Sequence, residues 1–209
     1  GETGSEITIT ATDDGEGALT ATQTFTIVVT TVNDAPVAVA DIATVSEDAA
    51  TTSFDVIAND TDEEEDTLTL TLVNTSGTGT VAINSDGVSV DYTPAVDFNG
   101  TEVITYTVSD GILTDETGIL KVTVTPVNDA PTITSTAVTE ATEDIAYTYT
   151  ITTEDVDGDL VTVSATGLPS WLTLTDNTLS GTPTEGETGS EITITATDDG
   201  EGALTATQT

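Results

Sequence analysis

Residues 67–72 read TLTLTL, and this alternation of leucine with threonine indicates how the whole chain folds. Successive side chains of a β-strand point to opposite faces, so Leu68, Leu70 and Leu72 are expected on a buried face and the threonines on a wet one. Threonine suits a wet face because it is β-branched and polar without adding charge. The same alternation occurs at Ile7, Ile9 and Ala11 and at Ile104, Tyr106 and Val108. No segment has a helical period, so the sequence predicts an all-β fold.

Turn residues separate these segments into short strands. Between residues 34 and 127 we expect strands at 37–45, 52–58, 67–73, 101–109 and 117–125, with a hairpin near 84–87. This spacing is typical of a seven-stranded immunoglobulin-like or cadherin-like β-sandwich. The sequence therefore predicts tandem seven-stranded sandwiches in an extended array.

An internal repeat sets the boundaries of these domains. Gly1–Thr24 recurs without a change at Gly186–Thr209, an offset of 185 residues, and VNDAP occurs at 32–36 and again at 127–131. Units of about 90 to 95 residues follow, which is the size of an immunoglobulin-like sandwich. We expect residues 1–33 to be the C-terminal strands of a truncated unit, 34–127 a complete sandwich, and 128–209 a sandwich that lacks its last strand.

The segment FTIVV at 25–29 follows the first copy of the repeat but has no counterpart after the second. A sandwich without its last strand exposes a groove and unpaired edges. One interpretation is that the chain is a piece cut from a longer array. The alternative is that residues 1–33 of one chain complete the last unit of another, which would give head-to-tail fibres.

Charge and composition exclude most classes of function. The 209 residues hold 38 Asp and Glu against one Lys or Arg, for a formal net charge of -37. Nucleic acid and anionic membrane would be repelled, and no apolar run is long enough for direct membrane insertion. Without Cys, His or Met the chain cannot form zinc, haem or iron–sulfur sites or a Ser-His nucleophile. The kind of site that remains is one in which oxygen ligands bind a hard cation. A hydrolase that uses a pair of carboxylates would need a cleft, and none is expected in an extended tandem sandwich, so we predict no enzyme.

Carboxylates from distant segments are expected to meet at one end of each sandwich. Strands of a sandwich alternate in direction, so particular loops share an end with the connection between domains. At the second connection the expected set is Glu47, Asp48, Asn128, Asp129, Asp155, Asp157, Asp159, Asp198 and Asp199. Calcium takes six to eight such oxygens with loose geometry, whereas magnesium prefers a stricter octahedron, so Ca²⁺ is the expected ion.

The first connection offers a matching set, in which the loop DEEED replaces DVDGD. Its members are Asn33, Asp34, Asp62, Glu64, Asp66 and Asp110. The longer glutamate side chains predict a looser site. For either set the alternative is an acidic turn in solvent, because Asp, Asn and Gly are ordinary turn residues.

The combined motifs resemble the bacterial cadherin-like repeats of large secreted adhesins. The unit from Asp34 is similar to the cadherin-like tandem type through NDAP, VSED, ANDTDEEEDTLTL and DFNGTEVITYTVSDG. The unit from Asp129 is similar to the dystroglycan-type cadherin-like domain through TEDIAYTY, DVDGDLVT, GLPSWLTL, LSGTP and ITITATDDG. By the cadherin pattern, the resemblance implies interdomain calcium ligands at Glu47, Asn128, Asp129, Asp155, Asp157 and Asp198.

The expected function is a structural extender of a large repetitive protein, outside the cell or on a bacterial surface, with calcium stiffening the array. Its expected partners are calcium, neighbouring repeats and, in the fibre alternative, identical chains joined head-to-tail or laterally. A second alternative is a recognition module that binds carbohydrate or like domains. Trp171 is the single tryptophan and is followed by alternating Leu172 and Leu174, which favours a packing role over a sugar site.

Overall fold

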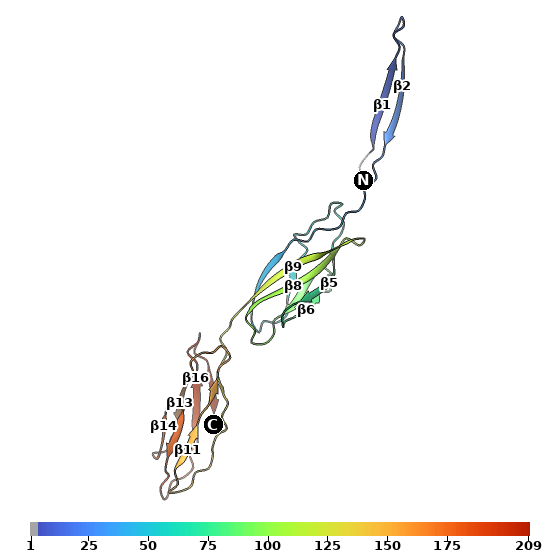
Figure 1. The fold of residues 1–209 in the computed structure, drawn as a ribbon. Coiled ribbons are helices and arrows are strands. Elements are labelled where there is room, and N and C mark those ends of the chain that lie inside the picture. The colour runs from blue at the N-terminus through green and yellow to red at the C-terminus, as the bar shows by residue number, and fades with distance from the viewer. Residues whose placement is uncertain (1–3) are drawn as a thin grey trace. The chain divides into compact units, whose positions relative to one another are not determined.

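The computed structural model describes residues 4–209, which contain strands β1 to β17 and no helix (Figure 1). None of these residues therefore forms a helix long and apolar enough to cross a membrane. The chain divides into two compact units. Unit 1 comprises Gly1–Val45, Ala49–Ala95 and Thr101–Thr123, and unit 2 comprises Ser46–Asp48, Val96–Gly100 and Val124–Thr209.

Seven strands between residues 41 and 125 form two sheets. A four-stranded sheet has the order β3–β9–β8–β5, and a three-stranded sheet has the order β4–β7–β6. Their bounds are Asp41–Ser46 for β3, Thr52–Asp55 for β4, Thr69–Thr75 for β5, Thr80–Ile83 for β6, Ser89–Thr93 for β7, Gly100–Ser109 for β8 and Thr114–Thr125 for β9. The predicted all-β, seven-stranded sandwich is thus confirmed.

Two details differ from the sequence pattern. The first strand of this sandwich, β3, begins at Asp41 rather than at residue 37. The reason is that the backbone N–H groups of Ala38 and Val39 donate to the carboxylates of Asp115 (3.0 Å) and Asp60 (2.7 Å) instead of to a neighbouring strand. A β-bulge between Leu70 and Leu72 then reverses the alternation in β5. Leu70 is buried, but Leu72 is 52% exposed, so the expectation that it faces inward is wrong.

A buried carboxylate lies inside unit 1. Glu102 is only 2% exposed and accepts hydrogen bonds from the N–H groups of Thr78 (2.6 Å) and Gly79 (3.0 Å) and from the Tyr92 hydroxyl (3.0 Å). A Cβ at Gly77 or Gly79 would overlap its side chain, which explains these two glycines. Burial opposes ionisation, but the hydrogen bonds from Gly79, Thr78 and Tyr92 outweigh it and lower the pKa of Glu102.

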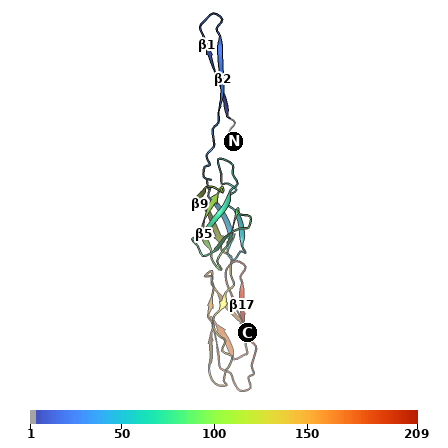
Figure 2. The same ribbon diagram turned by 90° about the vertical axis from the view of Figure 1, so that its right-hand side faces the viewer.

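Residues 5–27 form a hairpin of β1 (Ser5–Thr12) and β2 (Thr20–Ile27), in register over eight pairs from Ser5↔Ile27 to Thr12↔Thr20 (Figures 1 and 2). Every residue of β2 is exposed, and Phe25 and Ile27 keep 41% and 51% of their surface in solvent. The apolar residues of this hairpin are therefore not covered by a second layer.

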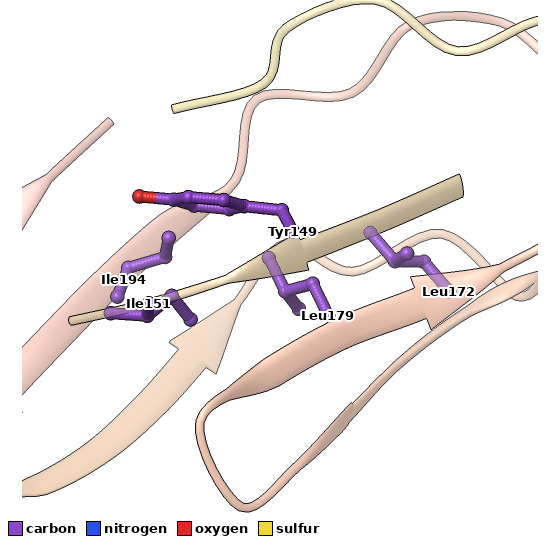
Figure 3. Packing of buried hydrophobic residues seen from close by; sticks show 5 residues of the cluster. All are labelled: Tyr149, Ile151, Leu172, Leu179 and Ile194. Atoms are coloured by element: carbon purple, nitrogen blue, oxygen red, sulfur yellow. The ribbon is translucent and has the colours of Figure 1, made fainter. Parts of the chain in front are cut away.

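Unit 2 is built from three small sheets. Their orders are β10–β12, β11–β15–β14 and β13–β16–β17. The strands are β10 (Thr132–Ile133), β11 (Tyr147–Thr150), β12 (Thr153–Glu154), β13 (Thr162–Thr166), β14 (Leu172–Thr175), β15 (Thr178–Gly181), β16 (Thr193–Thr197) and β17 (Thr205–Gln208). Its core cluster is made of Tyr149 of β11, Ile151 just after β11, Leu172 of β14, Leu179 of β15 and Ile194 of β16, which lie together in Figure 3.

We predict that Glu102→Gln lowers the free energy of unfolding of unit 1 by about 1–3 kcal/mol at neutral pH, because hydrogen bonds to a buried charged group are lost. The folded-state pKa lies below the ordinary value of 4.5, so this contribution is present above pH 4.5 and is lost as pH falls through the folded value. The difference between wild type and variant should therefore shrink in acid.

Urea unfolding followed by hydrogen exchange at unit 1 amides measures this difference. Glu16→Gln, at an exposed position, is the matched control and should leave stability unchanged. Equal stability of wild type and Glu102→Gln at neutral pH would contradict the account of the buried carboxylate.

Candidate metal centre

Carboxylates from four segments of unit 2 come together. They lie in the β3–β4 loop, the β7–β8 loop, the segment between β9 and β10, and the β12–β13 loop. Three groups have one oxygen per residue within 4.8 Å of the others: Glu47, Asp129 and Asp157; Asp48, Asp97 and Asp129; and Asp155, Asp157 and Asp159. Asp129 and Asp157 each belong to two groups, so the three groups form one cluster, which we call the Asp129 cluster.

The β12–β13 loop, DVDGD, is shaped by its first aspartate. One carboxylate oxygen of Asp155 accepts the N–H groups of Asp157 (3.0 Å) and Asp159 (3.1 Å). Gly158 has φ +81°, a left-handed conformation that few other residues adopt readily. This turn places three alternate carboxylates on one side of the loop.

Backbone N–H groups fix two further acids of the cluster. Asp129 donates its N–H to Asp157 (2.7 Å), and Val127 donates its N–H to Glu47 (2.5 Å). Glu47 is only 3% exposed. Both contacts hold the segment between β9 and β10 against acidic loops that are distant in sequence.

Asp198 is a buried acid at the edge of the same region, 4% exposed. One of its oxygens accepts the N–H groups of Gly200 (3.0 Å) and Leu204 (3.2 Å) and the amide of Asn128 (3.3 Å). A Cβ at Gly200 would overlap the side chains of Asn128 and Asp159, so only glycine fits between them. Asp199 accepts the N–H of Leu160 (2.8 Å).

Three carboxylate oxygens of this region are buried and have no hydrogen-bond partner among the described residues. They are the Oδ2 atoms of Asp129, Asp155 and Asp198. An unpaired buried charge is strongly unfavourable, and the chain has a single basic residue, Lys121, which is exposed. A bound cation would satisfy these oxygens, and the donor set, which is all oxygen, fits a hard divalent ion.

The pKa shifts of two acids in this region also indicate that negative charge is unfavourable there. Burial raises the pKa of Asp129, and the charges of Asp48, Asp97, Asp157 and Glu47 raise it further. Burial and the charges of Asp155, Asp199, Asp157 and Asp198 likewise raise the pKa of Asp159. Without a cation, the negative charges at this place oppose one another.

There is also room for an ion with water. Asp97, Asp129 and Asp155 line a hollow of about 350 Å³, together with Ala130, Thr132, Glu154 and Val156. Ca²⁺ and Mg²⁺ both keep water among their ligands in sites of this kind.

The first set of acids repeats the same scaffold in unit 1. Asp62 accepts the N–H groups of Glu64 (3.1 Å) and Asp66 (3.0 Å), as Asp155 does in DVDGD, and Glu65 has φ +57° where Gly158 stands. Asp34 donates its N–H to Glu64 (3.2 Å), which matches the contact of Asp129 with Asp157.

The side-chain oxygens of the first set, however, are less convergent. Asn33 donates to Asp110 (2.7 Å), and this contact, with the N–H groups of Leu113 and Ile112, lowers the pKa of Asp110. Asp62 has one buried oxygen without a partner among the described residues. None of the three close carboxylate groups found in those residues includes a member of the first set.

Sequence reasoning did not include Asp97. Its N–H donates to the Asp48 carboxylate (3.2 Å), and both residues have positive φ, at +54° and +56°. The signal was available, because the alternation of strand direction places the loop before β8 at the same end of a sandwich as the loop after β3.

Two family models match the chain. Residues 33–125 match a bacterial Ig domain, and residues 130–209 match a putative Ig domain. Domains of this class are generally non-enzymatic and are typical of extracellular or surface proteins. No curated protein matches the chain in sequence.

Solved structures of cadherin domains share the fold. Protocadherin Gamma B2 extracellular cadherin domains 3–6 match with a TM-score of 0.54 and 19% identity over 98% of this chain and 57% of that chain. Human CDH23 EC21–23 matches with a TM-score of 0.52 and 19% identity over 83% of this chain and 67% of that chain. The predicted resemblance to bacterial cadherin-like and immunoglobulin-like tandem repeats is confirmed.

An endo-fucoidan hydrolase from glycoside hydrolase family 107 is also similar, at 25% identity over 97% of this chain. The TM-score is only 0.36, and this chain spans 33% of the hydrolase.

We predict that, in the presence of chelator, Asp129→Asn melts at a higher temperature than wild type. Burial and four neighbouring acids disfavour the charged form of Asp129, so removing that charge relieves repulsion, and the gain should shrink as salt screens the cluster. Thermal unfolding at low and high ionic strength measures both effects.

Asp176→Asn, in the exposed turn between β14 and β15, is the matched control and should leave the melting temperature unchanged. A lower melting temperature for Asp129→Asn in chelator would show that charge repulsion at Asp129 does not limit the stability of the metal-free protein.

Proposed function

We propose, from the resemblance to bacterial immunoglobulin-like and cadherin-like tandem repeats, that this chain is a structural extender segment of an extracellular repeat protein and that its Asp129 cluster binds calcium. The observation that carries the proposal is the set of buried, unpartnered oxygens on Asp129, Asp155 and Asp198 in a chain of net charge -37. Such oxygens are stable when a cation binds them.

The proposed ligands are those whose oxygens already converge. Glu47, Asp129 and Asp157 would hold one ion, and Asp48 and Asp97 would share Asp129 with a second. Asp155 and Asp159, which converge with Asp157, and Asn128 and Asp198 beside them would complete the site. We favour calcium over magnesium because acids on several separate loops suit a large ion with loose geometry. The affinity expected for an extracellular module of this type is a dissociation constant of about 10⁻⁴ to 10⁻³ M.

A bound ion would stiffen the chain because its ligands come from several different segments. Glu47 and Asp97 belong to loops that follow β3 and β7, whereas Asp155 and Asp157 follow β12. Asp129 belongs to the segment between β9 and β10. A cation shared by these loops would restrict the motion of that segment, so an array of such repeats would be stiff at the calcium level outside cells.

The first set supports a weaker site of the same kind. It has the same backbone scaffold around Asp62 and one buried oxygen without a partner among the described residues. Glu64 stands where Asp157 stands in the Asp129 cluster, and its longer side chain has more rotatable bonds to order on binding an ion. We propose that Asn33, Asp34, Asp62, Glu64, Asp66 and Asp110 bind calcium with lower affinity.

We predict that calcium raises the melting temperature of unit 2 and that Asp155→Asn with Asp157→Asn abolishes the rise. Because calcium would bind the native cluster and not the unfolded chain, the stabilisation should reach about 2.7 kcal/mol at free calcium 100-fold above the dissociation constant. Calorimetry with calcium and with chelator, with Trp171 fluorescence for unit 2, measures it.

Asp62→Asn with Asp66→Asn removes the equivalent acids of the first set and is the matched control. It should leave the calcium response of Trp171 intact. If calcium does not change the unfolding of the wild type, the acids are turns in solvent and the proposed function fails.

We further predict that calcium narrows the distribution of distances between labels on the two units. The chain has no native cysteine, so Thr44→Cys and Thr173→Cys, both at exposed positions, allow spin labelling at two chosen points. Double electron–electron resonance should give a broad distribution in chelator and a narrow one in calcium. The same labels on Asp155→Asn with Asp157→Asn should stay broad, and an equally broad distribution for the unmutated cluster in calcium would contradict a stiffening role.

A further inference from the structure

The sandwich of unit 1 has an outer face whose central part carries no acid. The four-stranded sheet is built there from residues 42–46, 69–74, 101–107 and 117–123, and these stretches contain one acid, Glu102, which is buried on the inner side. The whole chain has 38 Asp and Glu. We call the outer side of these four stretches the Lys121 face. A second molecule that approaches this face therefore meets no carboxylate on it.

Lys121, the single basic residue of the chain, lies on this face. It is exposed, whereas Leu120 and Val122 on either side of it are buried, so its side chain points outward. Within the described part of the chain, its ammonium has no hydrogen-bond or ion-pair partner. β9 is an inner strand of the order β3–β9–β8–β5, so the ammonium stands away from both edges of the sheet. The cation is thus available to a carboxylate of another molecule.

Apolar side chains share the Lys121 face with this cation. Ile42 of β3, Leu72 of β5, Val103 of β8 and Ile119 of β9 are 38% to 87% exposed. Each of the four strands therefore contributes one exposed apolar residue, and outward-facing threonines occupy much of the remaining face. A surface that is poor in charge and rich in exposed apolar side chains is typical of a protein interface.

The outer face of the three-stranded sheet of the same sandwich carries acids. In the β4–β7 pair, Ser53 stands opposite Asp91 and Asp55 opposite Ser89, while Val90 between them is buried. Because side chains alternate along a strand, Asp55 and Asp91 point away from the core. We call the outward residues of β4, β6 and β7 the Asp91 face. Apart from these two acids, they are serine, threonine and alanine.

The carboxylate of Asp91 is fixed in place and ionised. It accepts hydrogen bonds from the Ser53 hydroxyl and from the Asn84 amide (2.8 Å). These two contacts lower the pKa of Asp91, so it stays negatively charged well below neutral pH. β7 is the middle strand of the order β4–β7–β6, so this anion stands near the centre of its face, as Lys121 does on the other sheet.

We propose that the Lys121 face of one copy of this chain binds the Asp91 face of a second copy, with the Lys121 ammonium paired to the Asp91 carboxylate and with Asp55 beside them. Of the three ways in which these two faces can meet, this one alone joins opposite charges. Two Lys121 faces would bring cation against cation, and two Asp91 faces would bring acids against acids. Charge complementarity therefore selects a contact between unlike faces.

This contact would join copies side by side. Both faces belong to a sandwich whose seven strands all lie between residues 41 and 125, and outer faces of sheets can pack face to face. A contact between unlike faces does not close between two copies, because one Lys121 face and one Asp91 face always stay free. The inference goes beyond an extender, since it adds lateral association between extenders.

The size of the face predicts a weak contact. Four strands about 4.8 Å apart make a face roughly 20 Å wide, and over about six residues of strand its area is roughly 400 Å². A standard interface buries about 800 Å² on each partner, so association is expected only at high protein concentration. The experiments therefore use a covalent trap and a method that measures weak association.

Carbodiimide cross-linking is the covalent trap. The reagent joins a carboxylate to an amine as an amide with loss of water, and with the N-terminal amine acetylated Lys121 is the single amine of the chain. An equal mixture of unlabelled and isotope-labelled chains shows by mass spectrometry whether the two joined residues come from different copies. We expect peptides that join Lys121 of one copy to Asp91 or Asp55 of the other.

Sedimentation equilibrium at physiological ionic strength measures the association itself. Lys121→Gln and the double variant Asp55→Asn with Asp91→Asn should each weaken it by about fivefold, as expected for the loss of an ion pair. The double variant makes the chain less negative, so diffuse repulsion alone would strengthen its association. Glu16→Gln with Asp176→Asn, at exposed positions, changes the net charge equally and is the matched control, which should not weaken association.

A mixture of the two variants tests the pairing of unlike faces. Lys121→Gln keeps an intact Asp91 face, and Asp55→Asn with Asp91→Asn keeps an intact Lys121 face. The mixture should therefore form pairs of one chain of each kind, with the wild-type affinity, and these pairs should not grow further. Thermal unfolding of each variant checks that its sandwich is intact.

Three results would overturn the proposal. They are cross-links of Lys121 only within one copy or only to acids outside the Asp91 face, association of Lys121→Gln equal to that of wild type, and a mixture of the two variants that forms no pairs. Each measurement can be made in calcium and in chelator and uses no residue of the Asp129 cluster. Failure of this proposal is therefore distinct from failure of calcium binding.

Discussion

Repulsion between carboxylates that are held out of water is the constraint on which the structure of unit 2 depends. Four segments place acids around Asp129, and Asp198 of the β16–β17 loop lies beside them. One oxygen each of Asp129, Asp155 and Asp198 is buried without a partner in the described chain. Hydrogen bonds from backbone N–H groups hold the acids in place but do not cancel their charge. The cation binding proposed for this cluster would relieve the repulsion and would couple folding to the ion concentration of the surroundings.

A second constraint is the need of a sheet edge for a partner. The repeated sequence forms a hairpin of the same register in both copies, yet Ile9 is 53% exposed and its equivalent Ile194 is 4% exposed. Local sequence therefore determines the turn and the register, whereas burial depends on which strands lie next to the hairpin.

Much of this organisation could be predicted from the sequence, for identifiable reasons. Alternation of apolar residues with threonine indicates strands, and the alternation of strand direction brought Glu47, Asp129 and Asp157 into one hypothesis. The bulge at Leu70–Leu72 could not be predicted, because it leaves the alternating pattern of letters unchanged. Burial of Glu102 was also missed, since two of its partners are backbone N–H groups of a glycine-containing turn and the third is the hydroxyl of Tyr92, and none of these contacts has a sequence signal.

The most direct test of the central claim is a calcium titration of the chelator-treated chain by calorimetry in about 1 M KCl. At that ionic strength the Debye length is about 3 Å, so diffuse attraction of calcium to a chain of net charge -37 is screened, whereas binding to converging oxygens persists. The account predicts saturable calcium binding that Asp155→Asn with Asp157→Asn reduces. Loss of all calcium binding in high salt would contradict it and would leave the acids as solvated turns.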